Sequence, residues 1–152
     1  MPGLRQWSHG LALTLCLALG GTPQARSPVI AGVGLGLTPE GVQEILGQPQ
    51  RRDASLGMRF WEYPERGVML IWAEGAPGVR GIVANSAAAG AVRQVRVGDS
   101  ESLLRRRWGT PARIRQSGRF LDFVGAGWVL SAELQEKKVV EITLMAATAA
   151  TH

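Results

Sequence analysis

One motif occurs twice in this sequence, at Gly36–Pro49 and at Gly98–Pro111, with the same internal spacing. Two residues after the first Gly of each copy stands a hydroxyl residue, Thr38 or Ser100, which can cap the free N–H groups at the start of a helix. A second Gly ends the helical run, and a Pro two residues later prevents its resumption. The motif therefore predicts two short helices in related halves of the chain, over residues 39–46 and from the Ser100 cap to Trp108.

Apolar and aromatic segments follow each predicted helix. An eight-residue helix is not stable alone in water, so the apolar stripe of Val42, Ile45 and Leu46 must pack on a sheet. The predicted strands cover residues 58–63, 67–73 and 80–84 in the first half, and 119–124, 127–134 and 138–145 in the second, with a lead-in strand at 92–97. We predict an α+β fold, a tandem repeat of one short helix plus a three-stranded antiparallel meander, with the helices on one face of the sheet.

The first 25 residues have the order of a secretory signal peptide. Arg5 precedes the apolar run Leu11–Gly20, and small and turn-forming residues follow, with cleavage expected after Gly20 or Ala25. The run is shorter than the roughly 20 residues that span a bilayer. Bulky residues precede Cys16, so we expect no lipid anchor. The sequence predicts a periplasmic or extracellular protein with no transmembrane segment after cleavage.

The motif spacing also divides the remaining chain. We predict a first repeat over residues 26–87, a second over 88–145 and a flexible tail over 146–152.

The repeated motif resembles the SmpA/OmlA (BamE-like) family. The residues that carry the resemblance are Gly36, Thr38, Val42, Leu46, Gly47 and Pro49, then Gly98, Ser100, Leu104, Trp108, Gly109 and Pro111. Two copies in tandem are also similar to the two-repeat architecture of the β-lactamase inhibitor protein. The resemblance implies a protein of the bacterial cell envelope, linked to outer-membrane assembly or maintenance, that binds other proteins and does no chemistry.

Residue types exclude several kinds of catalysis. The histidines are His9, in the signal segment, and His152, the last residue, and Cys16 is the single cysteine. Histidine- or cysteine-based triads and ordinary zinc sites are therefore not expected. The glycines of Gly32–Gly36 fit neither the dinucleotide fingerprint nor the phosphate loop. We predict no catalytic, cofactor-binding or metal-binding residues, although facing carboxylates of a small hydrolase remain an alternative.

The second half is rich in arginine. The chain has a formal charge of +5, and residues 93–119 include eight arginines, with Arg93 and Arg119 as the first and last. One interpretation is a solvated face on which arginine stems cover apolar surface. The other is a docking patch for an acidic protein, an anionic lipid or a polysaccharide. The candidate residues are Arg105, Arg106, Arg107, Arg113 and Arg115; we expect no nucleic acid as partner.

Trp61 is a further candidate. It alternates with Phe60 and should face the other side of its strand, where it packs into the core or, if that side is open to solvent, contacts a partner. Together these features predict an exported, non-enzymatic protein-binding module whose partner is an envelope or extracellular protein, with no cofactor. The alternatives are a polyanion-binding surface protein and the carboxylate hydrolase.

Overall fold

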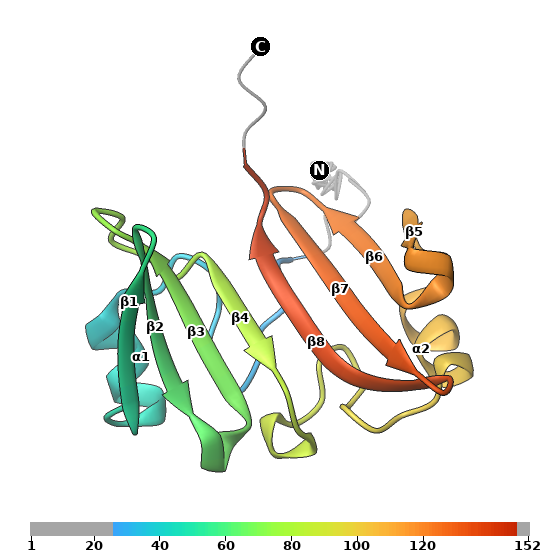
Figure 1. The fold of residues 1–152 in the computed structure, drawn as a ribbon, viewed down its shortest axis with the longest axis horizontal. Coiled ribbons are helices and arrows are strands. Elements are labelled where there is room, and N and C mark those ends of the chain that lie inside the picture. Colours follow the sequence, from blue (N-terminus) through green and yellow to red (C-terminus); the bar gives the residue numbers. More distant parts are fainter. Residues whose placement is uncertain (1–25, 149–152) are drawn as a thin grey trace, which may run out of the picture.

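The eight strands of the described residues join into one antiparallel sheet (Figure 1). A computed structural model describes residues 26–148. The strand order is β1-β2-β3-β4-β8-β7-β6-β5. The strands are β1 (Arg51–Ser55), β2 (Met58–Tyr63), β3 (Val68–Ala73), β4 (Gly81–Ala84), β5 (Arg113–Arg115), β6 (Phe120–Gly125), β7 (Trp128–Gln135) and β8 (Lys138–Ala146).

The predicted fold class is wrong. The protein does not consist of tandem three-stranded units, because a single eight-stranded sheet runs through both halves, with β4 paired to β8 at its centre. Two strands were missed, β1 and β5, which form the two edges of the sheet. An edge strand has a neighbour on one side only. Strand β1 is exposed along its whole length and β5 along most of it, so neither β1 nor β5 has the apolar alternation of a half-buried strand. Residues 92–97 form a tight turn closed by a bridge between Val92 and Val95 instead of a lead-in strand.

Both helix predictions are confirmed. Helix α1 (Pro39–Leu46) begins where Thr38 Oγ1 accepts a hydrogen bond from Gly41 N, and α2 (Glu101–Trp108) begins where Ser100 Oγ accepts one from Leu103 N. Gly47 and Gly109 follow the helices with positive φ angles of 77° and 83°, a conformation that favours glycine. The motif therefore encodes the two helix boundaries.

One hydrophobic core lies between the sheet and the two helices. Figure 1 shows both helices on the same side of the sheet, which we call the covered face. Val42 of α1 and Leu104 of α2 are fully buried in this core. The largest fully buried side chains of the sheet belong to the same core. The removal of each from water contributes about 2 kcal/mol to stability. These side chains are Leu70, Trp72, Ile82, Leu121, Leu130, Ile142 and Leu144.

Several predictions fall partly or wholly outside the described residues. The signal peptide at 1–25 lies outside them, as do residues 149–152 of the predicted tail. Strand β8 ends at Ala146, and the predicted boundary between residues 87 and 88 falls inside a short 3-10 helix (Ala87–Ala89). The division into two repeats stays a prediction.

Candidate interaction surface

No helix within residues 26–148 lies on the second face of the sheet, and we call it the uncovered face (Figure 1). In β3 the side chains alternate between buried on the covered face and partly exposed on the uncovered face, as expected for a sheet packed on one side. Met69, Ile71 and Ala73 therefore lie on the uncovered face, while Val68, Leu70 and Trp72 are buried. The strand registers extend this face across all eight strands.

One row of apolar residues crosses six strands of the uncovered face. Successive register partners place its members side by side from β2 to β6, and we call this set the apolar row: Phe60, Ile71, Gly81, Met145, Val129 and Val124. Val124 ends the row with 60% of its surface exposed. At Gly81, a Cβ atom would collide with Met145 Sδ and lie 3.3 Å from Ile71 Cδ1, so these two side chains lie over the glycine.

Methionine is concentrated on the uncovered face. Met58, Met69 and Met145 are the methionines of the described residues, and the registers place all three on this face. Each is partly exposed, and none belongs to the core. Methionine is flexible and polarisable, and it is common on surfaces that bind varied apolar partners.

A neighbouring row has charged ends and a less polar centre. It runs across all eight strands through Arg51, Glu62, Met69, Val83, Thr143, Ser131, Asp122 and Arg113. An arginine and an acid are thus register partners at both ends, Arg51 with Glu62 and Arg113 with Asp122. We call this set the charge-ended row.

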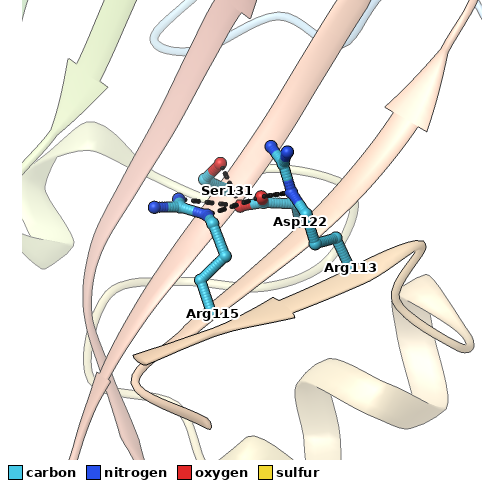
Figure 2. Close-up of polar contacts among 4 residues, drawn as sticks. All are labelled: Arg113, Arg115, Asp122 and Ser131. Carbon is cyan, nitrogen blue, oxygen red and sulfur yellow. Dashed lines mark hydrogen bonds and ion pairs between the residues drawn. The ribbon is translucent and has the colours of Figure 1, made fainter. Parts of the chain in front are cut away.

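Asp122 is the buried acid of this face, and Figure 2 shows its partners around it. Its Oδ2 accepts hydrogen bonds from Arg113 Nε at 2.9 Å and Arg115 Nε at 2.7 Å, while its Oδ1 accepts from Arg115 Nη2 at 3.0 Å and Ser131 Oγ at 2.7 Å. The Arg115 hydrogen bond, with help from Ser131 and Arg113 and against the effect of burial, lowers the pKa of Asp122 to about 2. Asp122 is therefore an ionised structural anchor at neutral pH.

Two further carboxylates lie together on the uncovered face. Glu133 and Glu141 are register partners on β7 and β8. Glu133 Oε1 accepts hydrogen bonds from the Arg119 guanidinium, the shorter of them 2.6 Å. The Arg115 and Arg119 guanidiniums also lie over the Phe120 ring, 4.8 Å and 5.4 Å from its centroid. Sequence reasoning missed this cluster, although alternation along predicted strands puts Phe120 and Asp122 on one face.

The predicted arginine patch is divided between two sides of the molecule. Arg113 and Arg115 extend onto the uncovered face, whereas Arg105, Arg106 and Arg107 belong to α2 on the covered side. Arg105 pairs with Glu101 at 3.1 Å, and all three arginines occupy the last turn of α2, where positive charge stabilises the helix dipole. The structure therefore does not bring the five candidates into one patch.

Trp61 lies on the covered face and is 8% exposed. Its ring packs 4.6 Å from that of Trp72, and the Arg52 guanidinium lies over it at 4.6 Å. The structure thus places Trp61 at the border of the core, and the side of β2 open to solvent carries Phe60 instead.

Residues 26–148 show neither a metal cluster nor a membrane-spanning helix. These residues contain no group of three His, Cys, Asp or Glu side chains placed to hold a metal ion. No helix that they form has the length and apolar character needed to cross a bilayer.

Comparisons with known proteins give structural neighbours only. No family model and no curated protein matches the chain. A DUF4309 family protein from Bacillus subtilis is 14% identical, with a TM-score of 0.51 over 72% of this chain and 78% of that one. A cysteine-rich secretory protein from Staphylococcus aureus is 11% identical, with a TM-score of 0.57 over 82% of this chain but 48% of that one. An extracellular protein containing an SCP domain, from Bacillus anthracis, is 10% identical, with a TM-score of 0.48 over 74% of this chain and 44% of that one.

The neighbours correct the predicted family. The resemblance to SmpA/OmlA (BamE-like) proteins and to the β-lactamase inhibitor protein is wrong, because the fold is shared with a DUF4309 protein and with part of a secretory protein. The physical reason is that the quoted motif specifies two helix boundaries, which many folds can use, and carries no information on the number or pairing of strands. The link to outer-membrane assembly rested on that resemblance and is withdrawn with it.

Proposed function

We propose that this chain is an exported, non-enzymatic protein-binding module that contacts its partner through the uncovered face. The observation that carries the proposal is the apolar row, whose side chains are partly or, at Val124, mostly exposed and lie outside the hydrophobic core. Contiguous exposed apolar surface on a soluble domain is typical of a binding site.

Two observations support export. The first 25 residues have the composition of a signal peptide. The Staphylococcus aureus neighbour is named a secretory protein, and this chain matches about half of its length.

The arrangement of the charged residues supports binding over catalysis. Asp122 is ionised and fully engaged by Arg113, Arg115 and Ser131, and Glu133 is engaged by Arg119. A glycosidase needs one carboxylic acid with a raised pKa, held in a cleft opposite a second carboxylate. Glu133 and Glu141 lie beside each other on a sheet surface, which favours the binding role over the hydrolase alternative.

A pair of matched variants tests the proposal. Val124 and Ile114 are both exposed β-branched residues, 60% and 55%, on the adjacent strands β6 and β5 but on opposite faces of the sheet. The wild-type protein, Val124→Asp and Ile114→Asp are each used to capture proteins from the envelope and medium of the source organism.

We expect one partner to be retained by wild type and Ile114→Asp and reduced at least about tenfold by Val124→Asp, since a buried Val contributes at least about 1.5 kcal/mol. Equal capture by both variants would contradict the assignment of the uncovered face. Loss of capture at high salt by all three proteins would favour the polyanion alternative.

A further inference from the structure

The apolar row has a defined length and direction. It crosses six strands, and adjacent strands lie about 4.8 Å apart, so the row is about 24 Å long. An α-helix rises 1.5 Å per residue, so a helix of about 16 residues has the same length. From β2 to β7 the row crosses strands that pair on both sides, so a strand of the partner would find no free backbone groups there, because free groups occur only at sheet edges.

The side chains of the apolar row and its flanking methionines can adapt their shape to an apolar stripe on a partner. Met145 and Ile71 lie over Gly81, and Met58 and Met69 flank the row on neighbouring positions. Methionine side chains change rotamer at low cost and can fill the gaps between the ridges of a helix. This is the chemistry of grooves that take the apolar side of an amphipathic helix.

The charge on the uncovered face differs between its two ends. At the β5 end the Arg113 side chain is 66% exposed and that of Arg115 is 39% exposed, whereas their acid Asp122 is 1% exposed. The charge presented to solvent there is positive. At the β1 end the exposed Arg51 is matched by the exposed Asp53, 2.9 Å away.

A second copy of this chain, stacked face to face about an axis along the charge-ended row, would bring two positive β5 ends together. Like charges oppose such a dimer.

From these observations, and resting on the proposed function, we infer that the partner presents an amphipathic helix of about four turns with an acidic first turn. Its apolar stripe lies along the apolar row, and its N-terminal carboxylates lie at Arg113 and Arg115. Acidic residues stabilise the first turn of a helix, so the partner carries them there at no cost to its own structure.

Three synthetic peptides of about 16 residues probe this inference. The first has a leucine stripe at helical spacing and glutamates in its first turn. The second keeps the stripe and has lysines in that turn, and the third has the first peptide's composition in scrambled order. Binding to the purified mature protein is measured by fluorescence anisotropy at low salt.

We expect the first peptide to bind with saturation, the second several-fold more weakly and the scrambled peptide not at all. Val124→Asp should weaken binding of the first peptide at least tenfold, and Ile114→Asp should leave it within twofold of wild type. Oxidising Met58, Met69 and Met145 to sulfoxides should also weaken it, since a sulfoxide makes an apolar side chain polar.

Three outcomes would overturn the inference: equal binding of all three peptides, equal effects of the two substitutions, or no binding. If no peptide binds while capture of a natural partner still depends on Val124, the inferred helical partner is wrong and the proposed function stands. If Val124→Asp behaves like Ile114→Asp in both experiments, both proposals fail.

Discussion

The two ends of the charge-ended row have the same backbone register but different electrostatics. Arg51 faces Glu62 across β1 and β2, and Arg113 faces Asp122 across β5 and β6. Glu62 is 32% exposed and lies 3.8 Å from Arg51, which bonds Asp53 on its own strand instead. Asp122 is 1% exposed and accepts hydrogen bonds from two arginines.

The difference follows from one position on each edge strand. Two residues after Arg51 stands Asp53, and two residues after Arg113 stands Arg115. Asp53 competes with Glu62 for Arg51, whereas Arg115 adds a second cation around Asp122. The cross-strand acid is a buried anchor at the end where the edge strand supplies two cations.

The largest expected effect is the removal of the buried acid. Asp122→Ala should lower the free energy of unfolding by about 2–3 kcal/mol, because two arginines lose their buried carboxylate partner. Both arginines are partly exposed, so we expect the loss to stay below the roughly 3–5 kcal/mol of a fully buried pair. Glu62→Ala should cost about 0–1 kcal/mol, as for an exposed pair. Urea denaturation of both variants measures the two values, and equal losses would contradict the distinction between the two ends.

The next effect appears as a dependence of stability on pH. The pKa of Asp122 is lowered from 3.8 to about 2 in the folded protein, so its ionised form stabilises the fold above about pH 4. As the pH falls from about 4 through 2, the folded protein loses this contribution of roughly 2 kcal/mol. Acid titration of the unfolding free energy should show this loss in wild type and in Glu62→Gln but not in Asp122→Asn. If Asp122→Asn lost as much stability as wild type between about pH 4 and pH 2, the loss could not be assigned to Asp122.

A smaller effect distinguishes the two arginines of the anchor. Arg115 bonds both carboxylate oxygens of Asp122, while the more exposed Arg113 bonds one. We expect Arg115→Ala to cost about 1–2 kcal/mol and Arg113→Ala less than about 1 kcal/mol. Thermal and urea unfolding of the two variants provide the measurement, and the reverse order would show that Arg113 dominates.

The smallest effect is expected from a substitution that makes the β1 end of the charge-ended row resemble the β5 end. Asp53→Arg removes the competitor of Glu62 and adds a second cation on β1, so we expect a stabilisation below about 1 kcal/mol at an exposed site. The gain should vanish when Glu62→Ala is combined with Asp53→Arg, which a double-mutant cycle measures. A gain that survives without Glu62 would assign the effect to net charge.

The sequence predicted the parts of the fold that depend on local chemistry. Thr38 and Ser100 marked the starts of both helices, and the apolar segments marked β2, β3, β4, β6, β7 and β8 within one or two residues. The β4–β8 pairing at Ala84 and Ile142 joins segments far apart in the chain, and no local pattern encodes it. The predicted count of strands was wrong because β1 and β5 look like polar loops in sequence.

The candidate surface was predictable only in part. The run Gly67–Ala73 is apolar at nearly every position, which suggests burial on both faces, yet Ile71 and Met69 lie on the uncovered face. Sequence alone cannot say which of two apolar faces the helices cover. Arg113 and Arg115 were named as binding candidates from charge, but their bonds to Asp122 depend on the β5–β6 register.

Binding through the uncovered face is tested by a photo-crosslinking amino acid placed at position 124 or at position 114 of the protein, in cells that produce it naturally. We expect a specific protein adduct from position 124, on the uncovered face, and none from position 114, on the opposite face. An adduct from position 114 alone, or the same adduct from both positions, would contradict the claim that the uncovered face is the binding surface.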